Sequence, residues 1–143
     1  ELSHHRMSDY VFDLDKMVAL EGDTAPYLLY SYVRSRSIFR KLDGKVELKG
    51  GNLRLTEKAE IHLVRMLTRY SDQVHQVVED YRPNLLATYL LELARAFHSF
   101  FEACPVLKSE GKIRESRLIL CDLTSRVLKD GLELLAIPVP ERM

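Results

Sequence analysis

The residues best suited to chemistry are aromatic and cationic side chains gathered in the run GDTAPYLLYSYVRSRSIFRK, from Gly22 to Lys41. The run holds three tyrosines and four cations, and no acidic residue follows Asp23. At about 3.6 residues per helical turn, one stripe of the helix collects Tyr27, Tyr30, Ser31 and Arg34. Nucleobases stack on aromatic planes and on guanidinium groups. The spacing therefore predicts a helix face suited to single-stranded RNA.

The same spacing also fits the edge of a hydrophobic core, because an aromatic ring buries a large apolar area. Charge does not separate the two interpretations globally, since Lys+Arg and Asp+Glu both number 21 and the formal net charge is zero. Locally the charge is uneven. Residues 12–23 hold four acids against one lysine, whereas residues 27–41 hold only cations, namely Arg34, Arg36, Arg40 and Lys41. This asymmetry predicts a basic face.

Not every arginine is expected to serve that face. Arg34 and Arg36 lie two residues apart and point in different directions on a helix, so at least one is a candidate for an internal ion pair or a solvated charge. Arg117 and Arg126 are as well placed to pair with Glu115 or Asp122 as to meet RNA.

No catalytic constellation accompanies these side chains. The sequence lacks a Gly-rich phosphate loop, a GxSxG elbow and an HExxH pair. Its two cysteines, Cys104 and Cys121, form no CxxC motif, so neither a disulfide nor a zinc site is predicted and a reducing, cytoplasmic location fits. No apolar run reaches the roughly 20 residues that span a bilayer. The chain is expected to bind rather than catalyse, without metal or membrane.

Helical periodicity dominates, and no segment alternates with period two as strands do. Residues 1–20 are predicted to be a lead-in with a short helix from Asp13, and residues 21–143 a single domain. The start at Glu1, with neither a signal-like segment nor an initiator methionine, suggests a piece of a longer protein.

Caps and breakers set the expected helix boundaries. Predicted helices cover residues 25–42, 57 to about 69, 72–80, 83–104 and 112 to about 137, with Thr24, Thr56 and Asp72 as caps of the first three. The helix after Pro83 has the widest apolar stripe and is expected to be central. Gly131, inside the last helix, suggests close packing or backbone exposure. The pattern predicts an all-α bundle of about five helices.

Three blocks resemble a known family. The runs GDTAPYLLYSYVRSRSIFRK, YLLELARAFHSFFEACPVL and SRLILCDLTSRVLKDGLELLAIPVPERM look like the carboxy-terminal part of arginyl-tRNA synthetases, a DALR-type anticodon-binding domain. The lead-in SDYVFDLDKM resembles the segment that joins the family's catalytic domain to this bundle. The resemblance implies docking on the anticodon arm of arginine tRNA, with no role for membrane or DNA. It also implies that ATP and arginine bind a separate catalytic domain, so this chain alone needs no cofactor.

The resemblance also implies roles for single residues. Tyr27 matches a tyrosine near the central anticodon base, and Ser31 stands where a small residue is typical. Phe101 and Pro105 occupy positions where aromatic residues can meet the anticodon loop, and Met143 matches a terminal methionine that reaches the anticodon pocket. Beside these, Tyr30 and Arg34 are predicted to contact the anticodon, and Arg36 and Arg40 to hold phosphates.

Two alternatives stay open from the sequence. On pattern alone, Phe101 also suits the hydrophobic core. The whole chain could instead be a helical scaffold that binds a protein, such as its own catalytic domain, through residues 1–20. An arginine tRNA whose central anticodon base is changed would separate tRNA recognition from scaffolding.

Overall fold

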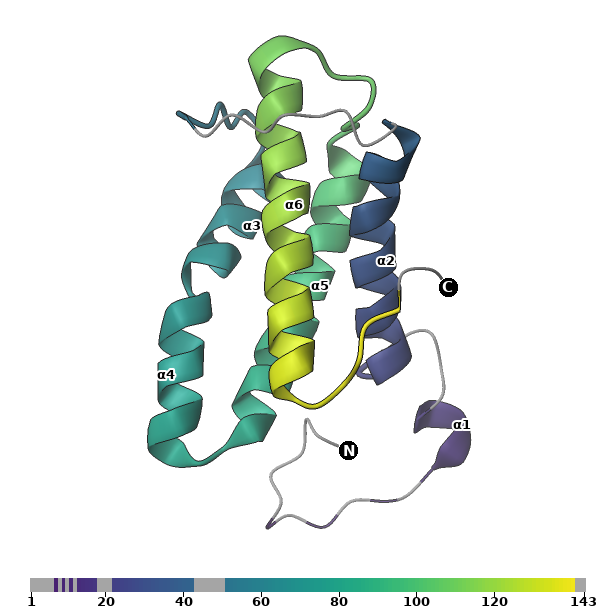
Figure 1. Cartoon of the computed structure of the whole chain (residues 1–143), viewed down its shortest axis with the longest axis vertical. Coiled ribbons are helices and arrows are strands. Elements are labelled where there is room, and N and C mark those ends of the chain that lie inside the picture. Colours follow the sequence, from purple (N-terminus) through teal and green to yellow (C-terminus); the bar gives the residue numbers. More distant parts are fainter. Residues whose placement is uncertain are drawn as a thin grey trace.

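The computed structural model describes Met7, Asp9, Val11 and residues 13–17, 22–42 and 51–140. Five helices form the bundle, and the one-turn helix α1 (Leu14–Met17) precedes it (Figure 1). The bundle consists of α2 (Ala25–Lys41), α3 (Lys58–Thr68), α4 (Tyr70–Asp80), α5 (Pro83–Ala103) and α6 (Gly111–Leu134). The described residues contain no strand, so the all-α prediction is confirmed. The predicted loop 43–52 lies largely outside the described residues.

Helix α2 begins at Ala25, directly after its N-cap residue Thr24. Thr24 has extended backbone angles, and its Oγ1 accepts a hydrogen bond from the Tyr27 backbone N–H at 3.3 Å. Pro26 occupies the first turn, where its missing N–H leaves no bond unmade. The predicted start and cap of this helix are therefore confirmed.

The predicted caps of the next two helices are wrong. Helix α3 is capped by Glu57, not Thr56, in a reciprocal capping box with Glu60. Helix α4 begins at Tyr70 directly after Arg69, two residues before the predicted cap Asp72. The Glu60 carboxylate, three residues into α3, accepts from the backbone N–H groups of Thr56 and Glu57 at 2.6 and 2.9 Å, so the cap is set by this acid and not by the threonine hydroxyl.

Helix α6 ends at Leu134, about three residues earlier than predicted. The backbone N–H of Ile137 donates to the Leu132 carbonyl and that of Ala136 to the Glu133 carbonyl, both at 2.9 Å. Ala136 adopts a left-handed φ of 59°. These two bonds form a Schellman motif, in which the left-handed residue is usually glycine. Because alanine occupies that position here, the sequence carried no signal for the end of the helix.

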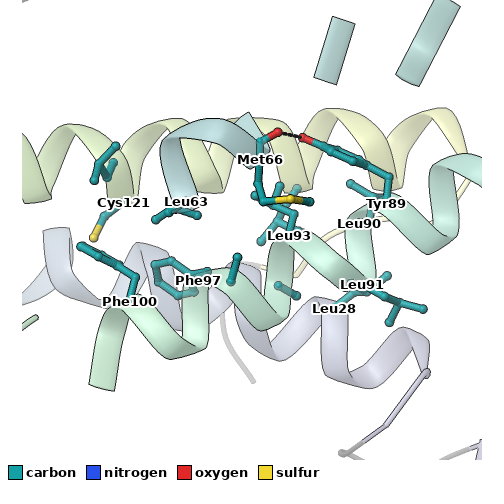
Figure 2. Close-up of a cluster of buried hydrophobic side chains, with 14 of the residues drawn as sticks. Leu28, Leu63, Met66, Tyr89, Leu90, Leu91, Leu93, Phe97, Phe100 and Cys121 are labelled. Carbon is teal, nitrogen blue, oxygen red and sulfur yellow. Dashed lines mark hydrogen bonds between the residues drawn. The ribbon is translucent and has the colours of Figure 1, made fainter. Parts of the chain in front are cut away.

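The apolar helix α5 is the centre of the bundle, as predicted. It contacts α2, α3, α4 and α6, and Figure 1 shows it behind α6, between α3 and α2. Its side chains supply much of the core, including Leu90, Leu93, Phe97 and Phe100, which are completely buried. Figure 2 shows these side chains meeting Leu63 and Met66 of α3 and Cys121 of α6.

A buried hydrogen bond ties α5 to the end of α3. Tyr89 is only 2% exposed, and its hydroxyl donates to the Met66 carbonyl at 2.8 Å (Figure 2). Burial raises the pKa of Tyr89 to about 12. The phenol therefore stays protonated and keeps donating at neutral pH.

Gly131 of α6 packs tightly against Leu90 of α5. A Cβ at this position would lie 2.6 Å from Cδ2 and 2.9 Å from Cδ1 of Leu90. Leu90 is completely buried and has no solvent to move into. The close packing that the sequence suggested at this glycine is confirmed.

We expect Gly131→Ala to destabilise the domain by about 1 kcal/mol. Overpacking costs roughly 1–3 kcal/mol, and the better helix propensity of alanine offsets about 1 kcal/mol of it. In a Leu90→Ala background the added methyl should be neutral or stabilising, because it meets space instead of a branched side chain. Urea unfolding of the four proteins measures this coupling, and an equal cost in both backgrounds would exclude the Leu90 contact as its cause.

Candidate nucleic-acid interface

The predicted stripe of α2 faces one side of α5, and the two helices together form what we call the α2–α5 seam. The seam consists of Tyr27, Tyr30, Ser31 and Arg34 from α2 and of His98 and Phe101 from α5. The Tyr27 and His98 rings stack with centroids 5.3 Å apart. The Tyr30 and His98 rings stack at 5.9 Å and are nearly parallel, at 9°. Residues about 70 positions apart in sequence thus build one aromatic stack.

A hydrogen-bonded chain runs through the seam beside these rings. The Ser31 hydroxyl lies 2.8 Å from the Tyr27 carbonyl oxygen and 3.0 Å from Nε2 of His98. On the other side of the imidazole, Nδ1 lies 3.2 Å from a terminal nitrogen of Arg34. The imidazole therefore links a buried hydroxyl to a guanidinium.

The guanidinium of Arg34 is held by rings as well as by the imidazole. Its central carbon lies 4.4 Å from the centroid of the Phe101 ring and 5.7 Å from that of Tyr30. It also donates to the Tyr30 hydroxyl at 3.4 Å. A cation over an aromatic face is attracted by the ring quadrupole. Arg34 thus covers one face of Phe101 and extends the stack with a second planar group.

The most exposed side chain of the seam is Tyr30, which is 41% exposed. Tyr27, Arg34, His98 and Phe101 are half-buried. Their surroundings change the acid–base properties of two of them. Burial raises the pKa of the Tyr27 phenol. Burial, and next the charge of Arg34, lower the pKa of His98. The seam therefore presents the neutral imidazole of His98 and the neutral phenol of Tyr27 beside the Arg34 guanidinium at neutral pH.

Comparison with known proteins identifies the family of this chain. The sequence profile of the DALR anticodon binding domain matches residues 28–143. This chain belongs to that family.

Relatives and solved structures agree with the assignment of a DALR domain. An arginine–tRNA ligase from Rippkaea orientalis is 49% identical over all of this chain and 25% of its own length. One from Synechocystis sp. is also 49% identical, with the same coverage. The arginyl-tRNA synthetase of Plasmodium falciparum superposes with a TM-score of 0.86 at 32% identity, over 99% of this chain and 25% of that one. The chain spans about a quarter of the length of the curated relatives it matches.

Among the predicted contacts of this DALR domain, Ser31 needs correction. Its side chain is completely buried, so it cannot touch a base directly in this arrangement. A small residue fits here because the hydroxyl lies beneath the imidazole and between the two helices. Phe101 is half-buried and its ring centroid lies 5.9 Å from that of Phe97, so it packs against the core, while its contact with the anticodon loop stays a prediction.

The predicted phosphate ligands do not join the seam. Arg36 pairs with Asp122 of α6 at 3.5 Å and lies over the Phe39 ring at 5.4 Å. This is the internal ion pair that the two-residue spacing from Arg34 had suggested. Arg40 donates to the Val33 carbonyl at 3.4 Å and is exposed. Phosphate binding by these two arginines stays a prediction.

Two other arginines pair with acidic side chains of the domain. Arg126 pairs with Asp122 at 2.7 Å, one of the partners expected for it. Arg117 instead pairs with Glu60 of α3 at 2.6 Å, a partner 57 residues away that its neighbours in sequence could not reveal.

The two remaining candidates are Met143, the last residue, and Pro105, in the connection between α5 and α6. Met143 lies outside the described residues, so its predicted contact stays a prediction. Pro105 is exposed after α5, and its carbonyl accepts from Arg117 at 3.4 Å.

The chain after α6 returns beside α2 (Figure 1), where Tyr32, Ile137, Pro138 and Val139 line part of a shallow pocket of about 510 Å³.

Sequence reasoning missed His98, the residue that links all the others. The available signal was a single polar ring in the apolar run AFHSFF, three residues before Phe101 on the same helix face. Without the pairing of α5 with α2, nothing in that run showed that two tyrosines, a serine and an arginine would surround it.

The described residues contain no group of three or more His, Cys, Asp and Glu side chains able to hold a metal ion. None of their helices is long and apolar enough to cross a membrane.

Proposed function

We propose that this domain binds the anticodon arm of arginine tRNA as part of an arginine–tRNA ligase. The observation that carries the proposal is the exposed Tyr30 ring, stacked with His98 beside the Arg34 guanidinium, in a domain of the anticodon-binding family. In this proposal ATP and arginine bind a separate catalytic domain of the same ligase, which also contacts this domain. The cytoplasm is the proposed site of action.

The chemistry of the seam suits an unpaired base. A base splayed out of the anticodon loop can lie on Tyr30 or on the outer face of the Arg34 guanidinium, and both are planar. Phe101 would act through Arg34, because the guanidinium already covers its ring. The cation adds attraction to neighbouring phosphates, which carries little sequence information.

The test is a titration of the chain with two transcripts at low and moderate salt. One is an arginine tRNA, and the other differs only at the central anticodon base. We expect the altered transcript to bind more weakly at both salt concentrations, and both affinities to fall as salt rises. Equal affinity for the two transcripts would exclude specific recognition and favour the scaffold alternative.

Tyr30→Ala should weaken binding of the arginine transcript roughly tenfold, because one base–aromatic stack is worth about 1–3 kcal/mol. Tyr81→Ala is a matched control, since Tyr81 is 87% exposed at the end of α4 and belongs to no part of the seam. Filter binding or fluorescence anisotropy measures both variants. A similar loss in the two variants would show that the Tyr30 ring has no special role.

A further inference from the structure

We infer that His98 is a positioning residue: its neutral imidazole, protonated at Nε2 alone, holds the Arg34 guanidinium against Phe101 as a platform for a base. The inference rests on the proposed function for the part that concerns tRNA. The protonation state and the hold on Arg34 follow from the geometry of the seam alone.

The hydrogen-bonded chain permits one neutral tautomer. The single hydroxyl proton of Ser31 is directed to the Tyr27 carbonyl at 2.8 Å. The Ser31 oxygen can therefore only accept from His98, so Nε2 carries a proton across the 3.0 Å contact. Arg34 has donors only, so Nδ1 must be unprotonated to receive it at 3.2 Å. Both contacts are satisfied by the Nε2–H imidazole and by no other form.

Packing prevents the ring from escaping this arrangement. Tyr27 and Tyr30 stack with the imidazole, and Phe97 meets it edge-on at 6.1 Å. Ser31 below is completely buried. Tilting the ring out of its plane would lose the stacking. A half-turn within the plane would keep the stacking but put a carbon in place of each nitrogen, so the two hydrogen bonds orient Nδ1 toward Arg34.

Protonation of Nδ1 would turn the attraction between His98 and Arg34 into a repulsion. The groups that face the imidazole are Arg34, Tyr27 and Tyr30 from α2 and Glu102 from its own helix. A second N–H would point at the donors of Arg34, and two cations would then share a half-buried site. Burial and Arg34 oppose this protonation more strongly than Glu102 favours it, and the pKa of His98 lies below its usual value. Arg34 should leave Phe101 only when the pH falls below that pKa.

Two substitutions separate the hold on Arg34 from simple packing. His98→Phe keeps a flat ring between the tyrosines but removes the acceptor for Arg34. His98→Asn loses most of the ring, yet its amide oxygen can stand near the place of Nδ1 and accept from the guanidinium. If His98 only packs, His98→Phe should reduce the discrimination between the two transcripts less than His98→Asn does. If His98 positions Arg34, His98→Asn should reduce it less.

The experiment has a part without tRNA. Nitrogen NMR of the chain should show His98 as the Nε2–H tautomer at neutral pH, with a pKa below that of a free histidine. A proton on Nδ1, or an ordinary pKa, would overturn the inference whatever the outcome of tRNA binding.

The second part uses the arginine transcript and the one with the altered central base. We expect His98→Phe to reduce the ratio of their affinities roughly fivefold, the usual scale of one hydrogen bond, and His98→Asn to preserve most of it. The ratio of the unaltered chain should fall as the pH drops through the His98 pKa, and that of His98→Phe should not. If the parent chain discriminates between the two transcripts and His98→Phe leaves the ratio of affinities unchanged, the positioning role alone is overturned. Equal binding by the parent chain would instead remove the proposed function.

Discussion

Replacing Arg117 with alanine should lower the free energy of unfolding by about 3–5 kcal/mol, because it leaves a buried carboxylate without its counter-charge. Glu60 is completely buried, and Arg117 is 6% exposed. The guanidinium donates to Glu60 Oε1 and to the Ser109 hydroxyl, each at 2.6 Å. The pair therefore ties α3 to α6 and to the loop before it. Denaturant unfolding measures the loss.

Arg126→Ala is the matched control for this prediction. Arg126 lies on the same helix and forms an ion pair with Asp122, but its side chain is 73% exposed. Exposed ion pairs contribute about 0–1 kcal/mol, so this variant should be nearly as stable as the parent. Similar losses for the two arginines would contradict a special contribution from burial.

The pH dependence of the Arg117 effect has a defined sign. Burial alone would raise the pKa of Glu60, but hydrogen bonds from the backbone of Glu57 and Thr56 and from Arg117 outweigh it, and the pKa lies below its usual value. The folded state thus favours the charged carboxylate. Its contribution is complete above the unfolded-state pKa and is lost as the pH falls through the lower folded-state pKa.

Without Arg117, the folded state favours the charged form of Glu60 less, and the protonated form more, than in the parent chain. The stability gap between the parent chain and Arg117→Ala should therefore narrow as the pH falls through the ordinary glutamate range, near about 4. Unfolding curves at several pH values provide the measurement. A gap that stays constant or widens in acid would show that the cost does not arise from an unpaired Glu60.

Phe97→Ala has the second large expected effect, a loss of about 3–5 kcal/mol of stability. The ring is completely buried, and its centroid lies 6.2 Å from that of Phe100 and 5.9 Å from that of Phe101. It also meets His98 edge-on. Deleting it leaves a cavity that the surrounding helices can fill only in part, directly beneath the α2–α5 seam.

Val78→Ala serves as the control, because Val78 is 66% exposed on α4, a helix with no buried residue. Surface substitutions of this kind usually change stability by less than about 0.5 kcal/mol. Urea unfolding compares the two variants. A loss at Phe97 no larger than that at Val78 would contradict its place in the core.

Much of the fold could be predicted because its signals are local. Pro26 and Pro83 mark the first turns of α2 and α5, and the apolar stripe of α5 is wide enough to identify the central helix. The errors occurred where local signals compete. The capping box of Glu57 and Glu60 displaced Thr56, and Ala136 adopted a conformation that its residue type disfavours.

The candidate site was predictable only on one helix. Tyr27, Tyr30 and Arg34 share a stripe because helical geometry alone places them there. Their partners depend on how α2 packs on α5. This packing stacks His98 with both tyrosines and places the Phe101 ring beneath Arg34. The same packing buried Ser31 and directed Arg36 away to Asp122.

The sequence by itself determined the helical class, the family and the side chains that one helix could offer to RNA, because periodicity, caps and family motifs depend on neighbours along the chain. Only the tertiary structure decided which of those side chains are exposed, paired or buried. Contacts such as Glu60 with Arg117 and Ser31 with His98 join residues 57 and 67 positions apart. Their formation depends on the packing of whole helices, which no short stretch of sequence encodes.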